Sequence, residues 1–164
     1  MLIRNERPED VAAIGAVTTA AFLGRPYSSQ TEALIVDALR AAGALTLSLV
    51  AEADGQVVGH IAFSPVDIEV SDGAWYGLGP VSVAPDHQSE GVGQLLIREG
   101  LARLEASGAA GCVLLGSPKY YERFGFEADE ALRYAGEPSP YLQRLRFKGK
   151  PPRGEVTYHT AFGA

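Results

Sequence analysis

The sequence predicts an α/β fold in which helices pack on a mixed sheet. Residues 45–66, "LTLSLVAEADGQVVGHIAFSPV", form two β-rich runs joined by Asp54-Gly55, a pair that favours the tight turn of an antiparallel hairpin. Residues 75–85, "WYGLGPVSVAP", predict a third long strand. A helical pattern from about Gly91 to Ser107 then precedes the apolar strand "CVLLG". Strand, helix and strand in succession predict a parallel pair, so the sheet should be mixed.

Two helices are predicted before the hairpin. After a short apolar start at residues 2–3, Pro8 and the acidic residues that follow it suit the first turn of a helix. Ser29 and Glu32 have the spacing of a capping box, and the second helix should end at Gly43. Gly77, Gly79 and Pro80 lie inside the long strand at 75–85 and predict a bulge.

The C-terminal part has weaker signals. Prolines punctuate residues 128–154, and the alternating segment "YLQRLRF" between them predicts a strand. The segment "EVTYHTAF" predicts a closing strand. The length of 164 residues fits one domain, so we expect residues 1–164 to form a single domain.

The amino-acid composition disfavours several kinds of binding partner for the protein. A formal charge of −6 disfavours nucleic acid, because phosphate backbones are bound mainly by lysine and arginine, and weakly favours a cationic substrate. No apolar run is long enough for a membrane helix and the N-terminus lacks a secretory signal, so we expect a soluble, cytoplasmic protein without membrane partners. The single cysteine, Cys112, excludes a multi-cysteine zinc site and is expected in the core; no metal is predicted.

Two glycines stand where the predicted helix begins, in "PDHQSEGVGQLL". Unpaired N–H groups and the positive end of the helix dipole converge there, so Gly91 and Gly93 would let an anion approach the backbone. The alternative is a tight turn with no ligand. Leu96 stands where a dinucleotide fingerprint needs a third glycine, and Gln94 where a P-loop needs lysine, so neither nucleotide loop fits.

These residues resemble the GNAT N-acetyltransferase superfamily. The pattern Gln88, two residues, Gly91, one residue, Gly93 is similar to its pyrophosphate loop, and "YYERFGF" at 120–126 is similar to its second recurring motif. The segment "LLGSPKYYERFGFE" resembles a bacterial branch of predicted N-acetyltransferases. The likeness covers most of residues 1–130 and the last strand. It implies a central mixed sheet of about six to seven strands flanked by about four helices.

The resemblance implies acetyl-CoA as cosubstrate. Its pantetheine arm would bond to the backbone of Val81 and Val83, and Ser117 could also contact it or simply cap a helix. The loop residues implied to hold the pyrophosphate are Gln88, Ser89, Glu90, Gly91, Val92, Gly93 and Gln94. Relatives often carry a basic residue where this chain has Ser89 and Glu90, so we expect weaker or more salt-sensitive binding.

The implied reaction is direct attack by a primary amine of a small molecule or protein on the acetyl group. Tyr121 aligns with the family's general acid. The general base stays open among His60, Asp67, Glu69 and water. The basic run from Arg144 to Arg153 is either a solvated face or a contact with a ribose phosphate or an acidic partner.

The acceptor site is implied to lie largely near residues 22–32 and the late loop. A noncatalytic acyl-CoA sensor and an interaction domain remain the alternatives to an enzyme, because a fold alone does not fix a function. The chain is expected to be a monomer or a homodimer.

Overall fold

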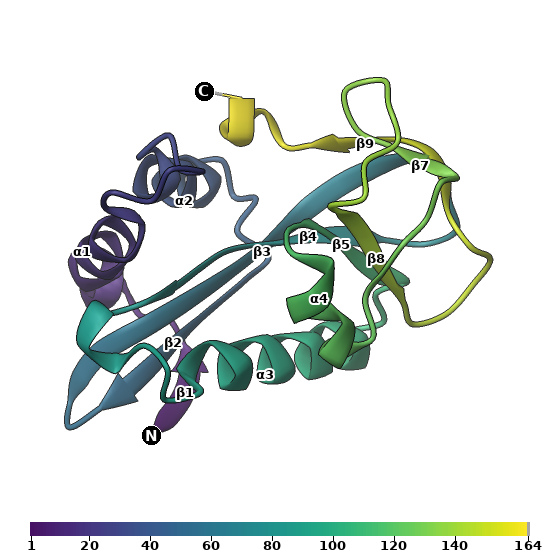
Figure 1. The fold of residues 1–164 in the computed structure, drawn as a ribbon. Coiled ribbons are helices and arrows are strands. Elements are labelled where there is room, and N and C mark those ends of the chain that lie inside the picture. Colours follow the sequence, from purple (N-terminus) through teal and green to yellow (C-terminus); the bar gives the residue numbers. More distant parts are fainter. Residues whose placement is uncertain (164) are drawn as a thin grey trace.

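The computed structural model describes residues 1–163, in which a mixed sheet of nine strands carries four α-helices (Figure 1). The helices are α1 (Val11–Phe22), α2 (Glu32–Ala41), α3 (Val92–Ala106) and α4 (Pro118–Tyr121). The strands are β1 (Leu2–Asn5), β2 (Leu47–Ala53), β3 (Gln56–Val70), β4 (Trp75–Val83), β5 (Gly111–Leu115), β6 (Glu127–Ala128), β7 (Leu132–Arg133), β8 (Leu142–Arg146) and β9 (Arg153–Tyr158). The predicted α/β fold is confirmed, and two strands of only two residues account for the larger strand count.

The long strand β3 organises the sheet. Strands β1 to β4 pair antiparallel in chain order, β4 pairs parallel with β5, and β8 pairs antiparallel with β5. The first half of β3 pairs with β2 and its second half pairs with β9. The C-terminal segment therefore returns to the centre of the sheet, as Figure 1 shows in yellow.

The turn between β2 and β3 forms as expected. Asp54 and Gly55 have φ values of 51° and 75°, and both values suit the residue pair that the turn contains. The expected capping box before α2 is wrong. Thr31 is the N-cap residue and makes no side-chain cap bond, while the Ser28 hydroxyl, not that of Ser29, donates to the Glu32 carboxylate.

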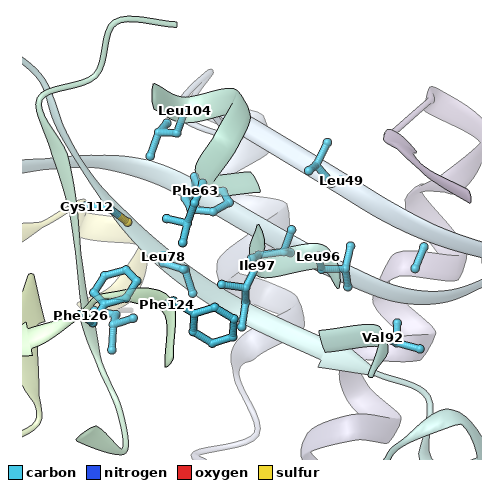
Figure 2. Packing of buried hydrophobic residues seen from close by; sticks show 14 of the residues in the cluster. Leu49, Phe63, Leu78, Val92, Leu96, Ile97, Leu104, Cys112, Phe124 and Phe126 are labelled. Carbon is cyan, nitrogen blue, oxygen red and sulfur yellow. The ribbon is translucent and has the colours of Figure 1, made fainter. Parts of the chain in front are cut away.

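The main core lies between the sheet and α3. Figure 2 shows Leu96 and Ile97 of α3 beside Phe63 of β3, and all three side chains are buried. Cys112 belongs to this core and is fully buried, as predicted. Burial in apolar surroundings raises the pKa of its thiol, which makes it unreactive.

A smaller core lies under α1 and α2. Ile14 and Val36 pack there against Val50 of β2. Helices thus cover both faces of the sheet, with α3 on one and α1 and α2 on the other (Figure 1). Within residues 1–163, no helix has both the length and the apolar character needed to cross a membrane.

Candidate active site

The site begins where two parallel strands separate. Strands β4 and β5 pair only through residues 75–77 and 111–113. Beyond Gly77, no strand among the described residues occupies the edge of β4 on the β5 side. The backbone of this edge is free to pair with an extended ligand, as in recognition by strand addition.

The predicted bulge lies on the same stretch of β4. Ile61 of β3 faces Val81 and Phe63 faces Leu78, so Gly79 and Pro80 together stand opposite a single residue of β3. A bulge bends its strand and increases the local twist. Val83, which follows the bulge, lies beside the first turn of α3: its Cγ2 is 3.8 Å from the position that a Cβ would take at Gly93.

The loop between β4 and α3 has the geometry of an anion site. Ser89 and Gly91 have φ values of 68° and 83°, and Gly91 is the N-cap residue of α3. The first bond within the helix runs from the Leu95 N–H to the Gly91 carbonyl at 3.1 Å. The preceding N–H groups have no partner within the helix, and they point toward its N-terminal end.

Gly93 lies in the first turn of α3, and its backbone conformation is one that any residue can adopt. A Cβ at this position would lie 3.8 Å from both Tyr120 Oη and Val83 Cγ2, an ordinary contact distance. Neither packing nor backbone strain inside the protein therefore explains the residue. The absence of a Cβ here leaves room for a ligand to approach the helix backbone closely.

Polar contacts fix the loop in place. Gln88 Nε2 donates to the Val83 carbonyl at 3.1 Å, and Gln88 Oε1 accepts from Arg25 Nη2 at 3.1 Å. The Glu90 carboxylate is half exposed and lies 3.1 Å from His87 Nδ1. Gln88 thus joins β4 to the segment between α1 and α2, while Glu90 lies beside an imidazole.

A wide cleft of about 730 Å³ lies beside the open edge of β4. We call it the transfer cleft. Its walls come from the end of α1 and the following segment, from the bulge of β4, from the end of β5 and from α4. The lining residues are Phe22, Tyr27, Leu78, Gly79, Pro80, Val81, Leu115, Gly116, Ser117, Tyr121 and Tyr141. The cleft therefore joins Val81, Ser117 and Tyr121, which the sequence placed in one site.

Tyr121 is held by a cluster of aromatic rings at the cleft. Its ring makes an edge contact with Tyr120 at a centroid distance of 4.9 Å, and it lies 6.0 Å from the rings of Phe124 and Phe126. Burial raises the pKa of the Tyr121 phenol to about 12. The hydroxyl is therefore protonated at neutral pH and can donate a hydrogen bond.

Ser117 begins α4 at the edge of the transfer cleft. It is the N-cap residue, yet its side chain makes no capping hydrogen bond, and the residue is exposed. Its carbonyl accepts from the N–H groups of Tyr120 and Tyr121 at 3.2 and 3.1 Å. The Ser117 hydroxyl is thus available to a ligand instead of serving the helix.

A second hollow of about 380 Å³ opens from the transfer cleft, and six lining residues are common to both. We call it the aromatic pocket. The residues that line it alone are Glu32, Ile35, Tyr134, Tyr158 and Phe162. The region expected for the acceptor, near residues 22–32 and the late loop, includes Glu32, although no motif singled it out. The abundance of aromatic side chains after residue 130 was the only signal for Tyr134, Tyr158 and Phe162, because strand and turn patterns do not show which face meets a cavity.

None of the three side chains considered as general base lines either hollow. His60 is fully buried on β3, where its Nε2 lies 2.7 Å from Ser48 Oγ. Asp67 and Glu69 are exposed at the far end of the same strand, and Glu69 binds Arg133 at 3.1 Å. Water at the mouth of the cleft remains the candidate proton acceptor.

The basic run lies away from the loop that begins α3. Lys148 Nζ lies 3.8 Å from the position that a Cβ would take at Gly108, just beyond the C-terminal end of α3. Arg144 binds Asp129 at 2.7 Å. A helix of 15 residues, about 22 Å long, separates this region from the Gly91 turn. This placement favours the solvated face over a contact with the cosubstrate.

Comparison with known proteins decides the family. Residues 2–128 match the family model described as "Acetyltransferase (GNAT) domain". The chain belongs to the GNAT acetyltransferase family. It is 42% identical to the N-acetyltransferase YhbS of Escherichia coli K12, over 99% of this chain and 98% of that protein.

Two solved GNAT structures have the same fold over nearly the whole chain. A GNAT family acetyltransferase from Brucella melitensis, in complex with acetyl-CoA, is 59% identical with a TM-score of 0.88, and the alignment covers 98% of this chain and 97% of that one. Escherichia coli YhbS, in complex with CoA, is 39% identical with a TM-score of 0.87 over 99% of this chain and 92% of that one. These alignments thus extend through the C-terminal part of the chain, where the sequence resemblance had covered only the last strand.

Proposed function

We propose that this GNAT protein is an acetyl-CoA-dependent N-acetyltransferase that acetylates a primary amine by direct attack. The observation that carries the proposal is the open edge of β4, which leads from the transfer cleft to the N-terminus of α3. Two relatives of the same fold were solved with acetyl-CoA or CoA, which supports this cosubstrate for the present chain.

The residues present fit such a molecule. An anionic pyrophosphate suits the N–H groups of residues 89–94, where Gly93 leaves the backbone open. An extended amide-containing arm suits the free edge at Val81 and Val83. Acetyl-CoA supplies the electrophilic thioester, and the transfer cleft has room for it beside Ser117 and Tyr121.

Tyr121 acts on the sulfur leaving group as a hydrogen-bond donor. Its phenol has a pKa of about 12, whereas a thiol has one near 8.5, so complete proton transfer would be unfavourable by roughly 5 kcal/mol. A hydrogen bond to the developing thiolate avoids this cost. The amine nitrogen bonds to the acetyl carbon, and the carbon–sulfur bond breaks. The nitrogen loses one proton to water. The thiolate that leaves is then protonated by solvent.

The amine reaches the thioester through the part of the transfer cleft that is shared with the aromatic pocket, at Gly79 and Pro80. Water at the mouth of the cleft removes its proton, because the described residues offer no carboxylate or imidazole beside Tyr121. The acceptor is a small molecule or an exposed amino group of a protein.

The test is thiol release from acetyl-CoA with a panel of primary amines, measured for the wild type and for Tyr121→Phe. We expect the variant to be about 10- to 1000-fold slower while it binds acetyl-CoA normally. Tyr120→Phe is the matched control and should retain most activity. Acetyl-CoA binding without turnover of any amine would favour a sensor instead, and absence of binding would favour an interaction domain.

A further inference from the structure

The aromatic pocket contains one charged group. Among the residues described, Glu32 is the only charged side chain that lines either the pocket or the transfer cleft. Its two carboxylate oxygens accept from the Ser28 hydroxyl at 2.8 and 2.7 Å. No lysine, arginine or histidine of residues 1–163 lies within 4.0 Å of this carboxylate, so no cationic side chain pairs with it.

Aromatic rings surround the same pocket. Tyr158 makes edge contacts with Tyr134 and Phe162, at centroid distances of 5.9 and 5.3 Å. The Tyr158 hydroxyl oxygen is shielded from solvent and has no hydrogen-bond partner among the described residues. Ring faces attract cations, so these aromatic rings suit an ammonium group in the pocket.

The path between this pocket and the reacting groups is apolar. Ile35, Leu78 and Leu115 line it, together with Phe22. Transfer at the thioester requires an uncharged amine, whereas Glu32 and the rings favour a cation. These two preferences are satisfied at once by a molecule that has one amine at each end of a hydrocarbon spacer.

We propose that the acceptor is an alkyl diamine, whose distal ammonium group binds Glu32 and the rings of the aromatic pocket. The inference rests on the proposed function and adds the chemical class of the acceptor. The net charge of −6 would also attract such a dication to the protein. The distal ammonium keeps its proton throughout, and only the amine at the thioester loses one.

The experiment compares four acceptors that have the same five-carbon chain. Cadaverine has a distal ammonium, pentylamine a methyl, aminopentanol a hydroxyl and aminopentanoic acid a carboxylate. We expect kcat/KM for cadaverine to exceed that for pentylamine by about tenfold or more, and aminopentanoic acid to be the poorest of the four. Because cadaverine has two equivalent amines, its kcat/KM is divided by two before the comparison.

Glu32→Gln tests the residue itself. It should reduce the preference for cadaverine over pentylamine to within about threefold, and Glu32→Asp should restore part of it. Glu9→Gln changes the net charge equally at an exposed site and should keep the wild-type preference. Calorimetric binding of acetyl-CoA by each variant shows that it is folded.

Three outcomes would overturn the inference. Equal turnover of all four acceptors would show that the distal group is not recognised. A preference that survives in Glu32→Gln would place the recognition elsewhere. Acetyl-CoA binding without acetylation of cadaverine would reject the diamine and leave the cosubstrate in place, whereas loss of acetyl-CoA binding by the wild type would reject the proposed function itself.

Discussion

Gly116 lies directly beside the ring of Tyr121: a Cβ at Gly116 would stand 2.7 Å from Tyr121 Cε2. The glycine at the end of β5 therefore makes room for the phenol that is proposed to act on the sulfur. The position of the Tyr121 ring therefore depends on the absence of a Cβ at Gly116 as well as on the aromatic cluster around the ring.

Gly116→Ala should displace the Tyr121 ring. We expect a loss of about 1–3 kcal/mol in the free energy of unfolding, because the methyl group overpacks a crowded site, and a fall in kcat of about tenfold or more. Chemical denaturation and steady-state kinetics measure the two effects. Gly15→Ala is the control, because a Cβ at Gly15 meets open space and alanine favours the helix. An unchanged kcat in Gly116→Ala would contradict the role of the ring position.

Glu90→Arg should strengthen acetyl-CoA binding at low salt. The Glu90 carboxylate is half exposed beside the loop that is proposed to hold a pyrophosphate, and its Oε1 lies 3.1 Å from His87 Nδ1. We expect affinity to rise about three- to tenfold near 20 mM salt and the gain to shrink as salt screens the charge. Calorimetric titration at two salt concentrations measures it. Equal affinities of the variant and the wild type at low salt would contradict this prediction.

Stability should fall as the pH drops below about 6.5 because His60 is buried. Burial lowers the pKa of His60 to about 4, although Glu6 raises it and Arg40 opposes Glu6. The unfolded chain therefore binds a proton near pH 6.5 that the folded chain does not accept until about pH 4. Across this window the contribution of His60 to the free energy of unfolding falls by up to about 3 kcal/mol.

His60→Gln measures that contribution. The variant loses the titrating group, so its free energy of unfolding should differ less between pH 7 and pH 4.5 than that of the wild type. Desolvation raises the pKa of the Glu6 carboxyl, but its bonds with Arg40 and Ser48 lower it by more, so Glu6 adds a loss in the same direction. Equal pH dependence in the two proteins would show that His60 does not titrate as described.

The architecture could be predicted from local signals, and the cosubstrate side of the site followed from it. Asp54-Gly55 determines a turn by backbone preference alone, and the glycines at positions 91 and 93 mark a helix start whose unpaired N–H groups are a property of any helix. Such features depend on a few neighbouring residues. Short motifs therefore located the loop and the bulge of β4, whereas Tyr121 was indicated by the resemblance to the GNAT family.

The proposed acceptor side depends on contacts between distant segments, which local patterns do not show; the resemblance indicated only the region near residues 22–32 and the late loop. Glu32 fits a capping box by spacing, but its carboxylate instead lines a pocket with Tyr158, which lies 126 positions later in the numbering of the chain. The bond between Arg25 and Gln88 likewise joins two loops that no local motif relates. His60 has a suitable ordinary pKa for a base, yet its strand position buries it away from the cleft.

The central claim is that acetyl-CoA binds with its pyrophosphate on the first turn of α3. The most direct test is a calorimetric titration of acetyl-CoA into the wild type, Gly93→Glu and the control Leu95→Glu. Residues 93 and 95 are about 200° apart around the helix, and Leu95 is exposed, so the control adds the same charge on the opposite side. A glutamate near a helix N-terminus suits the dipole, so both variants should fold.

We predict tight binding by the wild type, at least about 100-fold weaker binding by Gly93→Glu and only a small change in Leu95→Glu. Binding that is equally strong in Gly93→Glu would contradict the assignment of this loop to the cosubstrate.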